Sequence, residues 1–430
     1  MNKYYKKNIA FFIVLIFFIL SLAPIGTSIE TIELKENSYD SNDEILALYL
    51  LRGEHYLYFN ATEVVGSFNI KYAFPAELDY QFPIIMEILN DSTANIIKYR
   101  IENEANVPNK IVNFSISSMD MEDSGLIHFN FYVLVKNKDF SDLPKKIKIP
   151  KKDDLPPETT KWLSKSKVVQ KNRIIIRLRA RQMKVLTNNV LKLAKRIALF
   201  SRLHRYPLFF IQYKLGLYRS QDAFTALLIN GECPGRSHLG CALFRANNIP
   251  ARVVLANRDY PFWYEMHYMT EYYLPSYGWI LTEVHKGITP YETKNQIILR
   301  ICYPEDENNT QTDFINKKMK GIERWFWIDN EFVKPFYKDL VEGSRCSMFR
   351  EKEVFTDNIS GENAIIITKN VFDKYEYYLG MSLAGDNLEY FQNATNYQFQ
   401  AIEQLKISND MESYINYLEK ANGEYEKIII

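Results

Sequence analysis

The stretch NGECPGRSHLGCALFRANNIPARVV, residues 230–254, places a cysteine directly before a proline at a point where a helix is expected to begin. After the proline, apolar residues recur at helical spacing, at Leu239, Ala242, Leu243 and Ala246. Pro234 suits the first helical position, because the N–H group that proline lacks would have no partner there. The pattern predicts a helix that has Cys233 at its N-cap, ends at Asn247-Asn248 and leads into a buried strand.

The predicted position of Cys233 favours chemistry over packing. An N-cap residue lies beside free N–H groups and the positive end of the helix dipole, and both stabilise a thiolate. The position is therefore expected to lower the pKa of the thiol and raise its reactivity. A buried cysteine is more often a small hydrophobic residue, but Cys233 lies in a helix-start loop between Gly231 and Gly235, ahead of the apolar face. We therefore interpret Cys233 as a nucleophile.

A cysteine nucleophile needs a base that takes and returns a proton, and the base needs a group that orients it. Two extended runs, 264–273 and 278–284, flank Pro275-Ser276-Tyr277 and predict a β-hairpin. His267 lies on the first run and Glu283 on the second. With an odd-length loop centred on Pro275, the two side chains stand directly opposite each other, within about 5.5 Å at Cβ. An even-length loop would place them on opposite faces, so the predicted pair depends on an odd loop or a bulge.

These residues and their order resemble the transglutaminase-like superfamily over residues 160–290. The family pattern is G-x-C, a helix with L-R-A-x-G-I-P-A-R, then H-A-W-x-E and G-W-x-x-x-D. The matching positions are Gly231, Cys233, Leu243, Arg245, Ala246, 248–252, His267, Glu271, Gly278, Trp279 and Glu283. The resemblance implies a papain-like core, in which a helix that carries Cys233 packs on a sheet that carries His267.

The resemblance also implies a role for each residue of the site. Cys233 falls on the nucleophile, His267 on the base and Glu283 on the acid that orients the base. Two positions depart from the pattern. Glu283 is one methylene longer than the usual Asp, so it would orient the imidazole in a different geometry. Met269 stands where the family usually has Trp, which would alter a wall of the site.

Three other histidines are weaker candidates. His285 lies two residues beyond Glu283, on the same strand face if the strand continues, and is the one rival base. His238 is five residues into the predicted helix, about 140° round from Cys233, so it points elsewhere. His204 belongs to a basic helical stretch. No spacing of His, Cys or carboxylates matches a metal-ligand set, and no cofactor is expected.

The chain has 430 residues, 47% of them hydrophobic, and this length predicts two or three domains. Period-two alternation over 30–140 predicts a β-sandwich, and the Pro- and Lys-rich stretch 141–160 predicts a linker. The predicted transglutaminase-like core covers 161–295, a mixed strand-and-loop extension covers 296–370, and an antiparallel helix pair, broken near Asn409-Asp410, covers 371–430. The expected fold class is α+β, with a papain-like core between a β-sandwich and the C-terminal helix pair.

The N-terminus carries a targeting pattern. Three lysines precede an apolar run from Ile9 to Ala23, as in a secretory signal peptide. A retained signal anchor is the alternative, because no clean Ala-x-Ala cleavage site follows. Either form of residues 1–28 predicts an extracytoplasmic protein, secreted or anchored to the membrane. In that environment Cys302 and Cys346 could form the one intrachain disulfide.

Charge is distributed unevenly along the chain. The formal net charge is +1, yet residues 145–205 hold 19 Lys and Arg against three acidic residues. A solvated linker and helix face is the simple interpretation, and contact with an anionic membrane or an acidic surface polymer is the alternative. No aromatic ladder or nucleic-acid motif accompanies the charge, so no nucleic-acid partner is expected.

Two functions of different classes fit these observations. The favoured one is an exported cysteine enzyme that performs acyl transfer or hydrolysis on protein or peptide amides through Cys233, His267 and Glu283. The other is a catalytically degenerate transglutaminase-like scaffold or adhesion module at the surface, suggested by the flanking domains and by Glu283. The rate of thiol labelling against pH separates them, because an inert Cys233 with an ordinary thiol pKa fits only the scaffold.

Overall fold

The computed structural model describes residues 45–429, except 106–107, 139, 141–142, 186, 205–219, 259–265, 308–325 and 336–345. The predicted signal peptide or anchor, residues 1–28, therefore lies outside the described residues. No helix within the described ranges has both the length and the apolar character needed to cross a membrane.

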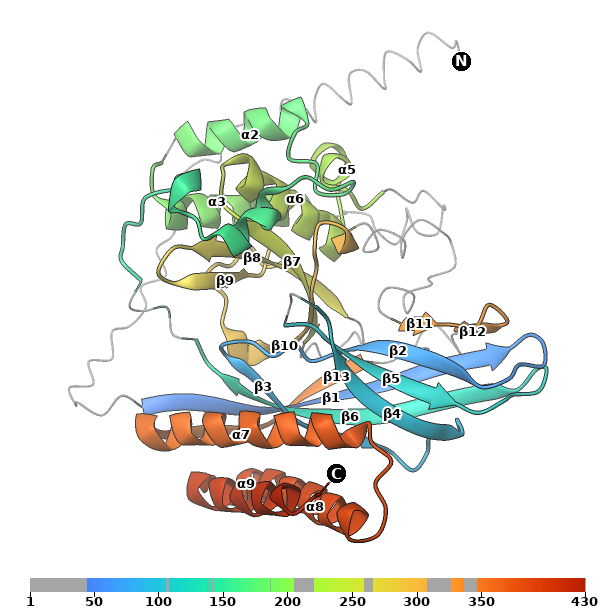
Figure 1. The fold of residues 1–430 in the computed structure, drawn as a ribbon. Coiled ribbons are helices and arrows are strands. Elements are labelled where there is room, and N and C mark those ends of the chain that lie inside the picture. Colours follow the sequence, from blue (N-terminus) through green and yellow to red (C-terminus); the bar gives the residue numbers. More distant parts are fainter. Residues whose placement is uncertain are drawn as a thin grey trace.

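The strand-rich part of the chain forms two antiparallel sheets that pack face to face (Figure 1). Alternating burial along the longest strand follows the period-two pattern of the sequence. The first sheet contains β1 (Ile45–Ala61), β3 (Gln81–Ile88), β6 (Ser124–Lys136), β12 (Val333–Pro335) and β13 (Cys346–Asp357). The second contains β2 (Phe68–Phe74), β4 (Ile96–Asn103), β5 (Lys110–Ile116) and β11 (Phe326–Ile328). The predicted strand-rich N-terminal region is confirmed.

The transglutaminase-like region packs helices on one face of a third antiparallel sheet (Figure 1). The sheet order is β10 (Gln296–Ile301), β7 (Ala251–Arg258), β8 (His267–Leu274) and β9 (Gly278–Thr282). The helices are α2 (Ile174–Val185), α3 (Val190–Leu203), α5 (Ala223–Leu228) and α6 (Cys233–Ala246), with short 3-10 turns η1 (Lys152–Asp154), η2 (Pro157–Leu163) and η3 (Thr293–Asn295). Helix α6 is buried on all sides from Pro234 to Arg245, so it forms the centre of this layer. The predicted α+β fold class is confirmed.

The stretch 296–370, expected as a mixed extension, supplies strands to two different sheets. Strand β10 pairs with β7 of the core sheet, whereas β11 pairs with β2 and both β12 and β13 pair with β1. Because these pairings join residues far apart in the sequence, local patterns could not reveal them. The chain thus leaves the sandwich, builds the core and returns to the sandwich.

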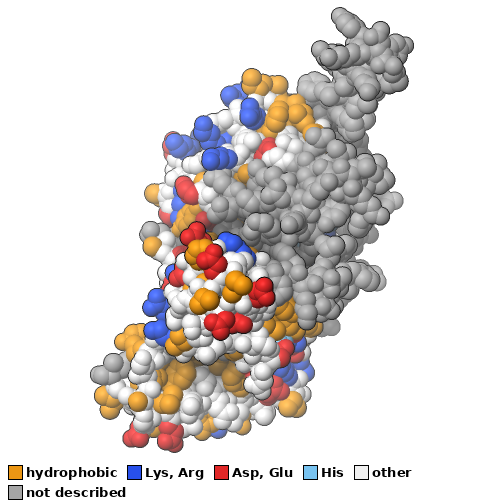
Figure 2. Space-filling view, turned by 90° about the vertical axis from the view of Figure 1, so that its right-hand side faces the viewer, with side chains coloured by type: hydrophobic (Ala, Val, Ile, Leu, Met, Phe, Trp, Pro, Cys, Tyr) orange, Lys and Arg blue, Asp and Glu red, His pale blue; other side chains and the backbone are white. Residues whose placement is uncertain are grey.

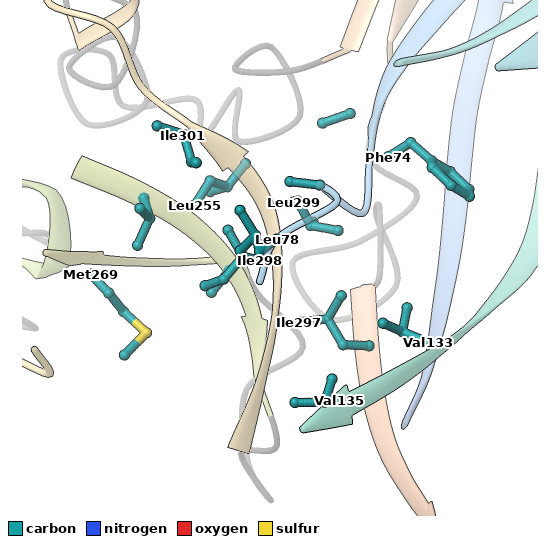
Figure 3. Close-up of a cluster of buried hydrophobic side chains, with 14 of the residues drawn as sticks. Phe74, Leu78, Val133, Val135, Leu255, Met269, Ile297, Ile298, Leu299 and Ile301 are labelled. Carbon is teal, nitrogen blue, oxygen red and sulfur yellow. The ribbon is translucent and has the colours of Figure 1, made fainter. Parts of the chain in front are cut away.

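One hydrophobic cluster joins the sandwich to the core. Figure 3 shows Val133 and Val135 from the sandwich beside Ile297 from the core sheet, and Phe74 and Leu255 belong to the same cluster. All of these side chains are buried. The contact between the two units therefore has the character of a domain interior, which stabilises their relative position.

The C-terminal region differs in one respect from the expected helix pair. The predicted break is present, because Asn409 has a left-handed φ of 59° and Asp410 caps the next helix. The structure, however, places three helices here: α7 (Asn358–Leu379), α8 (Asp386–Ser408) and α9 (Met411–Glu426). Helix α7 begins directly after β13, with Asp357 as its N-cap, and lies against the sandwich (Figure 1).

The disulfide that Cys302 and Cys346 could form is absent from the structure. Cys302 follows β10 in the core sheet, whereas Cys346 begins β13 opposite His55 in the sandwich. Both are buried thiols, and they belong to different sheets. No disulfide joins any of the four cysteines, all of which lie in the described part of the chain.

Candidate active site

Cys233 is the first residue of α6, and Glu232 is the N-cap. The sequence pattern had placed Cys233 at the cap and Pro234 at the first helical position, so the helix begins one residue earlier than predicted. The consequence for the thiol is small, because the first four N–H groups of a helix all lack helical partners. The thiol is half-buried, so Cys233 stays accessible at the positive end of α6.

Close backbone packing holds the loop that carries Cys233. The Gly231 N–H donates to the carbonyl of His204 at 2.8 Å, and the Glu232 N–H donates to Oε1 of Gln221 at 2.9 Å. A Cβ on Gly231 would lie 3.0 Å from the Cα of Gly235, and one on Gly235 would lie 2.8 Å from the same Gln221 oxygen. A side chain at Gly231 would therefore press on the backbone of Gly235, and one at Gly235 would displace the amide of Gln221. Gln221 was missed by the sequence analysis, since nothing in its spacing indicates this contact.

His267 and Glu283 meet at one end of the β8–β9 hairpin. Leu274 pairs with Gly278, so the loop has three residues, and the odd length on which the predicted pair depends is present. The loop is centred on Ser276, one residue later than expected, and this shifts the strand register by two. His267 and Glu283 are therefore diagonal neighbours rather than directly opposite. The longer Glu side chain spans this diagonal, and His267 Nε2 lies 2.8 Å from Glu283 Oε2.

The Cys233 side chain lies close enough to His267 to raise the pKa of its imidazole. Because Nε2 faces Glu283, Nδ1 is the ring nitrogen that remains for the thiol. Burial lowers the pKa of His267, but the Glu283 carboxylate, the Cys233 side chain and the hydrogen bond to Glu283 raise it, and the net pKa lies above the usual value. The structure thus brings the three predicted residues together in the order Cys233, His267, Glu283.

Glu283 stays ionised although it is fully buried. Burial raises the pKa of its carboxyl group, but the charge and hydrogen bond of His267, the charge of Arg258 and the N–H of His285 lower it to about 2. The His285 N–H donates to Oε1 at 2.8 Å. Each carboxylate oxygen therefore has a donor, and this fixes the orientation of Glu283.

Arg258, which the sequence analysis missed, is a fourth charged residue in the site. Its Nη1 lies 2.6 Å from Glu283 Oε2 and 3.2 Å from His267 Nε2. It is placed there by strand register: Ala256 pairs with His267, and Arg258 follows two residues later on the same face. The sequence predicted a strand over 249–255, which ends before Arg258. The position of Arg258 beside His267 could have been predicted only if the register of β7 with β8 had been known.

The rival base His285 is close to the site but poorly suited to accept a proton. Its ring centroid lies 5.7 Å from that of His267, and its Nδ1 contacts Arg236. Burial and the neighbouring charges, that of Arg236 first, lower its pKa to about 3, so its proton affinity near neutral pH is low. His238 points elsewhere, as predicted, and contacts the carbonyl of Gln221.

Several residues of the family pattern serve packing rather than chemistry. Arg252 Nε lies 2.6 Å from Glu271 Oε2, and Arg245 forms a fully buried ion pair with Glu307. Met269 was expected to line a wall of the site, but it is fully buried. Met269 belongs to the cluster of buried hydrophobic side chains that Figure 3 draws. The side chain of Met269 therefore contributes to the core.

The described residues contain no group of three or more His, Cys, Asp or Glu arranged to hold a metal ion. The polar groups of the site bind one another instead, as the contacts of Glu283 with Arg258 and His267 illustrate.

Comparison with known proteins supports the resemblance seen in the sequence. Residues 191–284 match the family model of the Transglutaminase-like superfamily, so the chain carries a transglutaminase-like core and the predicted resemblance is confirmed. No curated protein matches the chain. Among solved structures, a candidate cysteine protease from Cytophaga hutchinsonii is similar, with 15% identity and a TM-score of 0.48 over 71% of this chain and 100% of that chain. The periplasmic domain of TgpA from Pseudomonas aeruginosa, bound to ethylmercury, has 12% identity and a TM-score of 0.24 over 54% of this chain and 92% of that chain.

Proposed function

We propose that this protein is a cysteine enzyme that transfers the acyl group of protein or peptide amides, with Cys233 as nucleophile, His267 as base and Glu283 as the acid that orients the base. The observation that carries the proposal is the position of His267, which lies 2.8 Å from the Glu283 carboxylate and near enough to the Cys233 thiol for the thiol to raise the pKa of the imidazole. Nucleophile, base and orienting group within hydrogen-bond reach are the geometry that this chemistry requires.

The reaction proceeds in two stages. The Cys233 sulfur forms a bond to the amide carbonyl carbon, and the backbone N–H groups at the start of α6 stabilise the oxyanion. The intermediate breaks its C–N bond, and the leaving amine takes the proton held by His267. Water or a second amine then attacks the thioester and gives a proton to His267. The C–S bond breaks and releases the Cys233 thiolate, which restores the thiolate and imidazolium pair. With water the product is an acid, and with an amine it is a new amide.

One feature of the site favours the alternative function, a catalytically degenerate scaffold. Arg258 occupies the same Glu283 oxygen that orients His267, and its Nη1 is also 3.2 Å from His267 Nε2. A permanent cation beside the imidazole disfavours the imidazolium that the leaving amine needs. The scaffold would keep the fold of the site without its reactivity.

The test compares Cys233→Ala and His267→Ala with Cys241→Ala, a change in the same helix. Burial raises the pKa of Cys241 to about 12, so its removal should leave the chemistry unchanged. Ammonia release from glutamine peptides, peptide hydrolysis and incorporation of a fluorescent amine are measured together. We expect activity in the parent protein and in Cys241→Ala, and a loss of about 10³-fold or more in the other two variants. Retained activity in either of those two would reject the triad.

The scaffold makes the opposite prediction for the parent protein. Iodoacetamide would label Cys233 no faster than a free cysteine at any pH between about 5 and 8, and the three assays would stay silent. If iodoacetamide labelled Cys233 rapidly in the parent protein but slowly in His267→Ala, the scaffold function would be excluded.

We also propose that the chain acts outside the cytoplasm, on the strength of the lysines and apolar run in residues 1–28. N-terminal sequencing of the protein recovered from cell fractions tests this, and recovery of the intact chain from the cytoplasmic fraction alone would reject it.

A further inference from the structure

The outer face of α2 exposes a stripe of large apolar side chains. Ile174, Leu178 and Val185 are 75%, 54% and 86% exposed. At 100° per residue they lie within about 40° of one another around the helix. The opposite face, which includes Ile176 and Met183, is buried against the rest of the core. Single exposed apolar residues are ordinary, but three in one stripe on a twelve-residue helix form a surface.

Cations follow one flank of this stripe. Arg177, Arg181 and Lys184 are all exposed, and they lie about 20–80° from Ile174 around the helix. Helix α2 contains no acidic residue, and the sequence contains none between Glu158 and Asp222. The charges of this face are therefore uncompensated along the chain. Figure 2 shows Lys, Arg and hydrophobic side chains gathered at the upper end of the molecule, where Figure 1 places α2.

The cationic surface continues into the segment that precedes α2. Lys165, Lys167 and Arg173 line a groove there, and Glu305 is the one carboxylate among its lining residues. Because Arg173 directly precedes Ile174, the positive surface of the groove reaches the start of the apolar stripe.

We propose that this face of α2 docks on an anionic membrane surface. A helix with apolar residues on one stripe and Lys or Arg beside it lies in the interface plane, with the apolar side chains among the acyl chains and the cations at the headgroups. Helix α2 has twelve residues, too few to span a bilayer, so it would lie on the surface. A soluble acidic polymer would satisfy the cations but leave Ile174, Leu178 and Val185 in water, so lipid fits the whole face better. The docking surface is independent of the chemistry at Cys233.

The test places a fluorophore on the stripe in the full chain. Leu178→Cys and Val185→Cys are made in a Cys233→Ala background, since the other three cysteines are buried, and are labelled with an environment-sensitive nitrobenzoxadiazole. Ile359→Cys on α7, which is 76% exposed, is the matched control. Each protein is mixed with vesicles of phosphatidylcholine alone or with added phosphatidylglycerol.

We expect emission at 178 and 185 to rise about twofold or more and shift to the blue only with phosphatidylglycerol, and emission at 359 to stay unchanged. High salt should reverse the rise, and Arg177→Glu with Arg181→Glu should abolish it. The salt arm needs no variant of the basic residues, so it decides the question even if that double variant fails to fold. Equal emission in the two lipids, an equal rise at 359, or the same rise with soluble polyglutamate would overturn the proposal.

Discussion

At the scale of single residues, the site depends on one oxygen with two donors. Glu283 Oε2 lies 2.8 Å from His267 Nε2 and 2.6 Å from Arg258 Nη1. Arginine does not lose its proton in proteins, so Arg258 keeps Glu283 ionised while it competes with His267 for the carboxylate. Glu283 therefore favours the imidazolium and Arg258 disfavours it. We infer that Arg258 is a positioning residue whose charge sets how strongly His267 holds its proton.

The prediction for Arg258 concerns the titration of His267. Arg258→Gln removes a positive charge near His267, and the Glu283 carboxylate then has His267 as its only charged partner among these residues. The pKa of His267 should therefore rise further above its usual value. Arg258→Lys keeps the charge and should change the titration less, whereas Glu283→Gln should lower the pKa. Histidine ring NMR can follow each titration, since the chain has six histidines. A titration of His267 that is unchanged or shifted to lower pH in Arg258→Gln would contradict the assignment.

At the scale of elements, the arginine of helix α6 fixes the helix to the segment beyond β10. Arg245 Nη1 lies 3.2 Å from Glu307 Oε2 and donates to the carbonyl of Ser164 at 2.9 Å, and its Nε donates to the carbonyl of Ala251 at 2.8 Å. Burial raises the pKa of Glu307 although Arg245 lowers it. The pair is buried, so removing one partner leaves a charge with reduced compensation.

We predict that Glu307→Gln lowers the free energy of unfolding by about 3–5 kcal/mol, measured by urea denaturation. Arg245→Met should cost at least as much, because the carbonyls of Ser164 and Ala251 also lose their donor. The control is Glu403→Gln on α8, which breaks an exposed pair with Lys406 and should cost less than about 1 kcal/mol. If Glu307→Gln were as stable as this control variant, the buried ion pair would make no contribution to the free energy of unfolding.

Local sequence patterns predicted the elements of the site better than their registers. The glycines around Cys233 and the helix after it were readable because helix starts have local signals. The β8–β9 hairpin was readable too, but the length and centre of its loop were not, because the left-handed Ser276 and Gly278, with φ of 71° and 75°, set the turn. Arg258 and Gln221 were missed, since their contacts depend on register and on chain segments far apart. The strands that return to the sandwich depend on the same long-range pairing.

At the scale of the whole molecule, two side-chain amides of the sandwich form hydrogen bonds with the backbone of β10, the edge strand of the core sheet. Gln81 accepts from the Ile298 N–H at 2.7 Å and donates to the Ile298 carbonyl at 2.8 Å. Asn109 makes the same pair of bonds with Ile301, at 2.8 and 3.0 Å. Strand β10 is the edge of its sheet, so these amides pair with backbone groups that have no neighbouring strand on that side. The Ile298 carbonyl also accepts from the Ala76 N–H at 3.0 Å.

The two units should therefore unfold together. Cys302 in the core and Cys346 in the sandwich are both buried thiols, and each reports on its own unit. We predict that alkylation followed by peptide mass spectrometry finds both thiols reactive at the same urea concentration. Gln81→Met and Asn109→Leu should each lower the free energy of unfolding by about 1–3 kcal/mol, because each leaves a buried backbone N–H, that of Ile298 or of Ile301, without its acceptor. The exposed changes Gln392→Met and Asn95→Leu should have little effect. If Cys302 and Cys346 became reactive at clearly different urea concentrations in the unaltered protein, the sandwich and the core would be independent, and the amide contacts would not couple them.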